Sequence, residues 1–275
     1  MHKNNLRSSY LNNLKQKFEL LQILVKKDLE ARYKGSALGN LWSILNQLSQ
    51  LLIYTYVFSI VLKVKLSLKE LPEENSLVFG LWLFAGLLPW IAFTTGLTQA
   101  SVSVITQINL VKKVVFPLGL LPLISVISTL IESTFGIALL ITFVALKTGQ
   151  IHGTLALLPL ILLPQFLFTA GLGYLAAGLT VFLRDIPQAL AVILNLWFYL
   201  TPIVYPADII PRSLENWVFW LNPLATIAQI YRDLILIGKV GHLGEWLTVS
   251  LVSIVIFYGG FLVYKRLRPA FADVL

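Results

Sequence analysis

The sequence predicts an all-α integral membrane protein with six transmembrane helices. Hydrophobic residues make up 57% of the 275 residues and charged residues only 12%, which leaves too few polar side chains to cover a soluble globule of this size. Six apolar stretches are long enough to cross a bilayer, and most lysines and arginines lie on one side of them. Together these observations predict a membrane domain with a defined orientation.

The first 37 residues are polar and basic, and we expect them on the cytoplasmic side. They lack the apolar core of a cleavable signal peptide. From Leu14 to Tyr33, apolar residues recur at helical spacing and most lysines fall off their stripe. The stripe consists of Leu14, Phe18, Leu21, Val25 and Leu29. This pattern predicts an amphipathic interface helix along the inner leaflet, either with a functional role or solely as an anchor on anionic lipid.

A single transmembrane domain is predicted from residue 38 to residue 267, followed by a cytoplasmic tail, 268–275. A spanning helix needs roughly 20 mostly apolar residues, because about 30 Å of hydrocarbon is crossed at about 1.5 Å per residue. Six stretches meet this requirement: 38–62, 77–100, 118–146, 154–183, 186–205 and 246–264.

A seventh apolar segment, 216–231, is short and is interrupted by Asn222-Pro223. Proline removes a backbone donor and disfavours helix just before it. We therefore expect a pair of short re-entrant or interfacial helices on the outer side. Six crossings also return the basic C-terminus to the side of the basic N-terminus, which seven would not do.

The basic residues orient the chain. With the N-terminus inside, two thirds of the 21 lysines and arginines fall on the cytoplasmic side, as the positive-inside rule requires. The others are expected outside, where acidic residues largely offset them: Lys63, Lys65, Lys69, Lys147, Arg212, Arg232 and Lys239. Membrane orientation thus explains the net charge of +8 more simply than nucleic-acid binding, and no nucleic-acid partner is expected.

Residues that perform covalent chemistry are scarce. The chain has no cysteine and its three histidines are far apart, so we expect neither a metal site nor a redox centre. It contains neither a Gly-x-x-x-x-Gly-Lys-[Ser/Thr] phosphate loop nor a nucleophile elbow. We expect no cofactor and no catalytic residue on this chain, and energy from ATP would have to come from another chain.

Glu132 is the one ionisable residue deep inside a predicted span. Such a residue is a functional candidate that should face the bundle interior or water. It could serve proton-coupled transport, or it could be a structural carboxyl group held by hydrogen bonds, and the sequence favours the second.

The segment between the second and third spans mixes two lysines with an apolar ridge. It is either a short docking helix or an ordinary connector that obeys the positive-inside rule.

The aromatic residues also allow two interpretations, an interfacial belt or the lining of a pathway. Most of the tryptophans suit an interfacial belt, namely Trp42, Trp82, Trp90, Trp217, Trp220 and Trp246. The aromatic residues of the first and fifth spans could instead line a pathway, because flat amphipathic rings suit sugars.

Four stretches resemble the permease subunits of type-2 ABC exporters for polysaccharides, the family that moves O-antigen, capsular polysaccharide and teichoic acid precursors. They are RYKGSALGNLW (32–42), INLVKKVVFPLGLLP (108–122), FLRDI (182–186) and TPIVYP (201–206) with the later Asn222-Pro223. In their order and spacing, these stretches cover nearly the whole chain. One departure is Asn46-Gln47, where many relatives read asparagine-proline.

The resemblance implies a homodimer in the bacterial cytoplasmic (inner) membrane, with two copies of a separate ATPase that binds ATP and Mg²⁺. The interface helix and a docking segment would contact the ATPase, the first and fifth spans would line the channel, and the segment after the fifth span would gate its outer mouth. The docking residues would be Asn109, Leu110, Val111, Lys112, Lys113, Val114 and Phe116. The channel residues would be Trp42, Tyr54, Tyr56, Phe58, Trp197, Phe198 and Tyr199. The outer gate would comprise Tyr205, Pro206, Trp217, Trp220, Asn222 and Pro223.

The expected cargo is a polyisoprenyl-diphosphate-linked polysaccharide. Arg32 and Lys34 could hold its diphosphate at the inner entrance, or they could simply anchor lipid headgroups. Alternative functions are ABC export of a drug or lipid, proton-coupled transport through Glu132, and, last, an intramembrane glycosyl-transferring enzyme.

Overall fold

The computed structural model describes residues 2–39, 41–61, 76–112, 116–206 and 210–275. Side chains are described from residue 15 onward in these ranges, except at 59, 76–78, 212 and 214–217. Every regular element in the described ranges is a helix, which confirms the all-α prediction. The main helices are α1 (His2–Arg32), α2 (Leu41–Tyr54), α3 (Ser76–Val102), α4 (Ile108–Val111), α5 (Leu120–Thr148), α6 (Leu158–Thr180), α7 (Ile186–Leu200), α8 (Arg212–Leu221), α9 (Pro223–Arg232), α10 (Leu243–Leu267) and α11 (Phe271–Val274).

Short π and 3₁₀ turns extend several of these helices. The π turns are η1 (Thr55–Val61), which continues α2, and η5 (Asp233–Ile237), which continues α9. The 3₁₀ turns are η2 (Ile105–Gln107), η3 (Gly153–Leu157) and η6 (Arg268–Ala270).

Four helical stretches in the described part of the chain are long and apolar enough to cross a membrane. They are Phe79–Val102, Leu120–Thr148, Gly153–Thr180 and Leu243–Val274, and they confirm four of the six predicted spans. The other two predictions, 38–62 and 186–205, coincide with α2 and η1 and with the shorter α7. Six crossings therefore remain a prediction.

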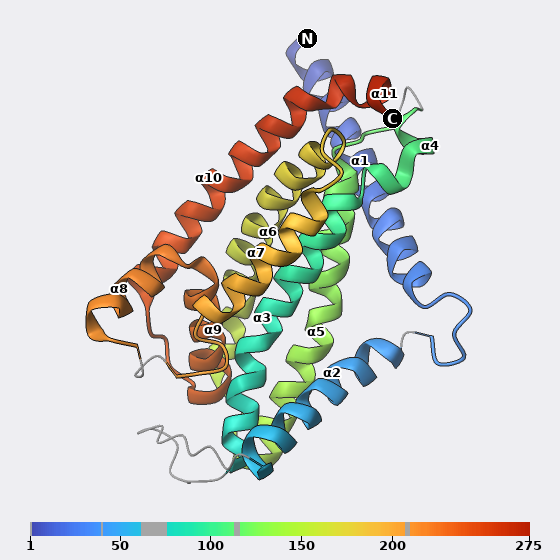
Figure 1. Cartoon of the computed structure of the whole chain (residues 1–275). Coiled ribbons are helices and arrows are strands. Elements are labelled where there is room, and N and C mark those ends of the chain that lie inside the picture. The colour runs from blue at the N-terminus through green and yellow to red at the C-terminus, as the bar shows by residue number, and fades with distance from the viewer. Residues whose placement is uncertain (1, 40, 62–75, 113–115, 207–209) are drawn as a thin grey trace.

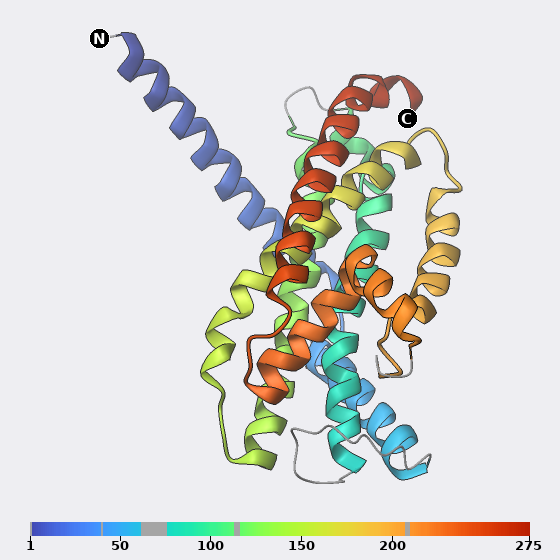
Figure 2. The same ribbon diagram turned by 90° about the vertical axis from the view of Figure 1, so that its left-hand side faces the viewer.

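The helices run up and down between two ends of an elongated bundle (Figure 1). Both termini lie at one end, together with α4, the start of α5 and the end of α10 (Figure 1). The N-terminal half of α1 projects away from the other helices (Figure 2), whereas its C-terminal half reaches the bundle beside α5. The predicted segment is thus helical, and the helix begins earlier than residue 14; its position along the inner leaflet remains a prediction.

Helix α3 occupies the centre of the bundle and packs against α5, α6, α7 and α9. Its residues from Phe79 to Trp90 are nearly all buried, including Trp82 and Trp90. These two tryptophans therefore lie in the core, and their assignment to an interfacial belt is wrong. The reason is that the part of α3 up to Phe93 is apolar on all its faces, as expected of a helix surrounded by others.

Helices α6 and α10 approach each other at two glycines. A Cβ atom on Gly260 would meet the carbonyl oxygen of Gly171 at 2.0 Å, and one on Gly171 would meet the backbone of Ile256 at 2.6 Å. Small residues allow such contact between membrane helices, where close packing replaces the hydrophobic driving force. The two helices therefore form a tightly joined pair.

Helices α8 and α9 meet at Asn222-Pro223, as the sequence predicts for the segment 216–231. Pro223 occupies the first turn of α9, where its missing N–H costs nothing. The Asn222 side chain accepts a hydrogen bond from the Leu224 N–H at 3.2 Å and so caps the helix. The break is therefore built into the local sequence.

A cluster of buried residues, separate from the core around α3, closes the end of the bundle that carries the termini. Tyr174 donates a hydrogen bond to the Gly119 carbonyl at 2.8 Å, and Tyr264 donates one to the Leu118 carbonyl at 2.9 Å. Phe271 of the predicted tail belongs to the same cluster as these two tyrosines and is fully buried. The segment 268–275 is thus part of the packed structure.

Gly260→Ala should destabilise the protein by roughly 1–3 kcal/mol, because the added methyl group forces α6 and α10 apart. The control is Gly259→Ala, whose Cβ meets nothing within 4 Å and which should be neutral or slightly stabilising. Thermal unfolding of the purified protein in detergent measures both. Equal melting temperatures for the two variants would refute the close contact.

Candidate functional site

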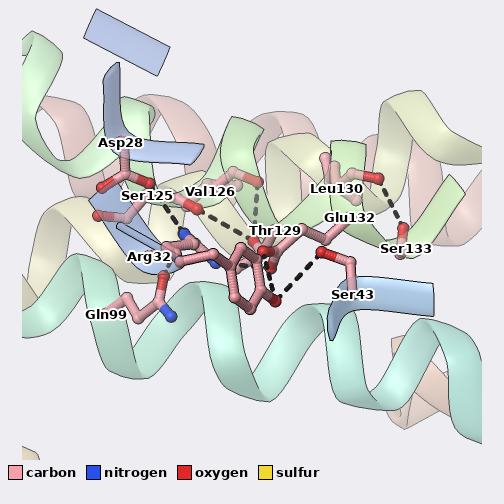
Figure 3. A network of polar contacts seen from close by, with 11 residues as sticks. Asp28, Arg32, Ser43, Gln99, Ser125, Val126, Thr129, Leu130, Glu132 and Ser133 are labelled. Atoms are coloured by element: carbon pink, nitrogen blue, oxygen red, sulfur yellow. Dashed lines mark hydrogen bonds and ion pairs between the residues drawn. The ribbon is translucent and has the colours of Figure 1, made fainter. Parts of the chain in front are cut away.

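Arg32, the last residue of α1, is the centre of a polar network (Figure 3). Its Nη1 donates a hydrogen bond to Glu132 Oε2 at 2.6 Å, and its Nη2 donates to Asp28 Oδ2 at 2.9 Å and to Gln99 Oε1 at 2.5 Å. The Arg32 and Glu132 side chains are only 15% and 16% exposed. A guanidinium group suits this role, because its planar donors can reach several acceptors at once.

The network continues from α5 into α2. Tyr33 donates to Glu132 Oε1 at 3.3 Å, and Ser43, which is buried near the start of α2, donates to the Tyr33 hydroxyl at 3.1 Å. Four helices, α1, α2, α3 and α5, therefore meet through one set of side chains. We name Asp28, Arg32, Tyr33, Ser43, Gln99 and Glu132 the junction network.

Glu132 is thus an ion-paired carboxylate facing the bundle. The arrangement agrees with the structural interpretation made from sequence, and Arg32 is the counter-charge that sequence reasoning did not connect to it. A partly buried charge is tolerated when it is paired and hydrogen-bonded, and removing one partner is costly. With two carboxylates beside it, Arg32 has little free positive charge to offer an anion.

A cavity of about 370 Å³ lies next to the junction network. Its walls include Asp28 and Arg32 of α1, Gln99 of α3 and Leu110 of α4. The cavity joins the junction network to the predicted docking segment, so the two regions are neighbours in space.

The docking segment forms the short helix α4 and the chain just after it. Asn109 and Lys112 are exposed, whereas Val111 is buried, and Leu110 and Phe116 are half-buried against the cluster that contains Val25 of α1. Lys113 and Val114 lie outside the described residues. The segment thus has a polar outer face and an apolar inner face, as expected of a helix held on the bundle.

The apolar stripe of α1 faces α5 only in its C-terminal part. Val25 is buried and Leu21 and Leu29 are half-buried, but Phe18 is 60% exposed. The side chain of Leu14 lies outside the described residues. Lys34, just after α1, is exposed. Phe18 therefore lies at the edge of the contact between α1 and α5, where it lines a cavity with Ile127 and Ile131.

The predicted channel aromatics fall into two groups. Tyr54, Phe58, Trp197 and Phe198 pack against the main core, where Trp197 lies 5.5 Å from Phe93 and Phe198 lies 5.5 Å from Trp90, measured between ring centroids. By contrast, Trp42, Tyr56 and Tyr199 are 40%, 58% and 65% exposed. Only the second group exposes a large part of its side chains.

The residues predicted as an outer gate adjoin the end of α7. Asn222 donates to the Thr201 hydroxyl at 2.8 Å and accepts from the Trp197 indole N–H at 3.1 Å. Tyr205 donates to the Tyr199 carbonyl at 3.0 Å. Pro206 is half-buried, Pro223 is buried and Trp220 is 50% exposed, while the side chain of Trp217 lies outside the described residues. Asn222 thus links α7 to the break between α8 and α9.

Arg232, at the end of α9, is the residue that sequence reasoning missed. The charge count assigns it to the outer surface, but the structure buries it to 1% exposure. Its guanidinium donates hydrogen bonds to the carbonyls of Trp82, Pro202 and Ile203 at 3.3, 3.0 and 2.8 Å. The guanidinium carbon lies 3.5 Å from the centre of the Trp82 ring, a favourable cation–π contact.

Comparison with known proteins identifies relatives along nearly the whole chain. The family model described as "ABC-2 type transporter" matches residues 19–236. The chain is 32% identical over 266 residues to the O-antigen export system permease protein RfbA of Klebsiella pneumoniae, covering 96% of this chain and 97% of that protein. It is 29% identical to the protein of the same name from Myxococcus xanthus, over 92% of this chain and 94% of that protein. It is 21% identical to the polysialic acid transport protein KpsM of Escherichia coli, over 92% and 96% of the two chains.

A double-mutant cycle on Arg32→Gln and Glu132→Gln should give a coupling energy of roughly 1–3 kcal/mol, because each single change leaves a partly buried partner unpaired. The same cycle on Lys26 and Glu30 of α1 is the control. Their charges lie 3.9 Å apart but are 79% and 62% exposed, so a coupling of about 0.3–0.5 kcal/mol is expected. Unfolding free energies in detergent provide both values, and similar couplings for the two pairs would contradict a special role for Arg32 and Glu132.

Proposed function

The chain belongs to the ABC-2 type transporter family of membrane proteins, and from this premise we propose that it is the channel-forming permease of an ATP-driven exporter of lipid-linked polysaccharide. The observation that carries the proposal is the similarity over nearly the full length to three O-antigen export permeases and to polysialic acid transport proteins. ATP and Mg²⁺ would bind to a separate ATPase subunit, because a permease of this family is not itself the catalytic chain.

Two copies of the ATPase would dock on the end of the bundle that carries α4 and both termini. The exposed outer face of α4, with Asn109 and Lys112, and the projecting half of α1 offer surfaces there. This end would then be cytoplasmic, in agreement with the excess of lysine and arginine on that side. With six crossings, and with α8 and α9 as a re-entrant pair, both termini would lie on this cytoplasmic side.

The junction network supports a route from ATPase to channel wall. A movement of α1 pulls directly on Glu132 of α5 and Gln99 of α3, and through Tyr33 on Ser43 of α2. Because these contacts are short and polar, they transmit displacement more directly than a contact between flexible apolar side chains. Closure of the ATPase dimer on ATP would therefore move α2 relative to the centre of the bundle.

A second copy of the chain would complete the path. Helix α2 with its continuation η1, and helix α7, pack on α3. Both carry exposed large residues, among them Leu52, Tyr56, Leu196 and Tyr199. In a homodimer these faces would lie opposite their copies or along the channel. The exposed aromatics Trp42, Tyr56 and Tyr199 are then the ones placed to stack on sugar rings.

The diphosphate of a polyisoprenyl-linked glycan would enter near the end of α1. Lys34 is exposed and available to an anion, whereas Arg32 would first have to leave Asp28 or Glu132. We therefore assign the first contact with diphosphate to Lys34. If Arg32→Ala with Lys34→Ala left both export and membrane level unchanged, neither residue would bind the diphosphate.

The ion pair also bears on proton-coupled transport through Glu132. Both carboxylate oxygens of Glu132 already accept hydrogen bonds, from Arg32 at 2.6 Å and from Tyr33 at 3.3 Å, which favours a structural role over a proton relay. Export of a drug or lipid keeps the same architecture and differs only in cargo. The similarity to polysaccharide permeases favours the glycan.

Transport by inside-out membrane vesicles tests the proposal. Vesicles that contain this chain and its ATPase should take up a lipid-linked glycan only when ATP is supplied, and vesicles with an ATPase variant that cannot hydrolyse ATP serve as the control. Uptake by the chain alone, abolished by Glu132→Gln, would establish the proton-coupled alternative instead.

Asn109→Glu combined with Lys112→Glu should weaken ATPase binding by roughly tenfold, because two new carboxylates must be desolvated at the contact. Copurification of the ATPase with the tagged permease measures the loss. Lys147→Glu, an exposed site at the end of α5 away from α4, is the control and should bind normally. Normal binding by the double variant would exclude α4 as the docking site.

A further inference from the structure

The guanidinium group of Arg232 is buried, and its hydrogen bonds to described residues all go to carbonyl groups inside the protein. Two of its hydrogen bonds go to the carbonyls of Pro202 and Ile203 in the turn after α7, and the third goes to Trp82 of α3. The side chains of Pro202 and Ile203 are buried, and this turn follows the last residue of α7, Leu200. Carbonyls beyond a helix end need donors from elsewhere, and Arg232 provides them.

Gly86 makes room for the guanidinium. A Cβ atom at this position would lie 2.4 Å from Arg232 Nη2. Gly86 and Trp82 are four residues apart and share one face of α3. One turn of α3 thus provides the open space, the aromatic face and one carbonyl, and α9 provides the cation.

The α8–α9 pair holds the end of α7 at two points. At the break between α8 and α9, Asn222 bonds to Thr201 and Trp197. At the far end of α9, Arg232 bonds to Pro202 and Ile203. The outer end of α7 and the α8–α9 pair are therefore joined into one body.

The same end of α9 also fastens this body to the central helices. Tyr231 donates to Gln165 Oε1 of α6 at 2.9 Å, and Gln165 in turn donates to the Pro89 carbonyl of α3 at 3.1 Å. The attachment to α3 thus runs through Arg232 directly and through Tyr231 by way of α6. Both contacts are polar and enclosed by the core.

We propose that Arg232 is a latch that holds the end of α7 and the α8–α9 pair against α3, and so keeps the outer end of the export path closed. The proposal rests on the function proposed above. A guanidinium bound by main-chain carbonyls is suited to a reversible contact, because breaking the bonds exposes the cation and the carbonyls to water that fills an opening path. Arg232 is therefore a positioning residue and need not touch the cargo.

A single-cysteine reporter can test the latch, since the chain has no cysteine of its own. Ile203 is fully buried, so Ile203→Cys should react slowly with a membrane-impermeant maleimide added outside spheroplasts that contain the complete complex. Arg232→Gln, which removes the charge, should increase the labelling rate about tenfold, because at least one hydrogen bond to a charged group is lost.

Gly86→Ala keeps the arginine but fills its niche, and it should also accelerate labelling of Ile203→Cys. Gly259→Ala, with open space around its Cβ, is the matched control and should leave the rate unchanged. Arg232→Lys retains the charge and should fall between Arg232→Gln and the parent. The thermal stability of the purified complex is measured for each variant.

Faster labelling in Arg232→Gln and Gly86→Ala, by clearly more than any fall in their melting temperatures accounts for, is the expected result. Unchanged labelling in both, or labelling that rises only in proportion to lost thermal stability, would overturn the latch. A complex that exports no polysaccharide but still shows labelling controlled by Arg232 would refute the proposed function and leave the latch standing.

Discussion

Two guanidinium groups, one buried and one partly buried, show how this chain satisfies charge within an apolar bundle. A charged side chain in a membrane interior must find its counter-charge or its hydrogen bonds inside the protein. Arg32 is held by the carboxylates of Asp28 and Glu132, whereas Arg232 is held by carbonyls and a tryptophan ring. The first site uses charge pairs, whereas the hydrogen bonds described for the second go to main-chain carbonyls, yet each joins segments that are distant in the sequence. Much of the arrangement of the surrounding helices follows from these two requirements.

Helix α3 is common to both solutions. It contributes Gln99 to the junction network near one end and Trp82 and Gly86 to the Arg232 site near the other. Between them it is buried on nearly all sides and contacts α5, α6, α7 and α9. A helix so enclosed is the natural fixed reference of the bundle. Polar contacts tie α1 to one end of α3, and α7 with α8 and α9 to the other. Of these segments, α1 and α7 expose far more of their side chains than α3 does.

The sequence predicted the elements better than their contacts. Long apolar runs identified α3, α5, α6 and α10, and Asn222-Pro223 identified the break between α8 and α9, because these signals are local. The pairing of Arg32 with Glu132 was not predicted, since the two residues are 100 positions apart and only the fold brings them together. Arg232 and Trp82 were misassigned for a related reason: a positive-inside count and an aromatic-belt rule treat each residue alone, and neither can detect that the tryptophan and the arginine cover each other.

The glycine contact between α6 and α10 has a consequence for how the protein is made. Helix α6 enters the membrane well before α10 is synthesised, so the surface around Gly171 first faces lipid rather than protein. Lipid chains cannot reproduce the close backbone fit that Gly260 provides. The contact between α6 and α10 therefore forms only after α10 has been synthesised. A chain released from the ribosome before that point would leave α6 without its partner helix. Correct biogenesis thus depends on the C-terminal part of the chain, although the polar contacts of Arg32 and Arg232 are all formed from residues synthesised before it.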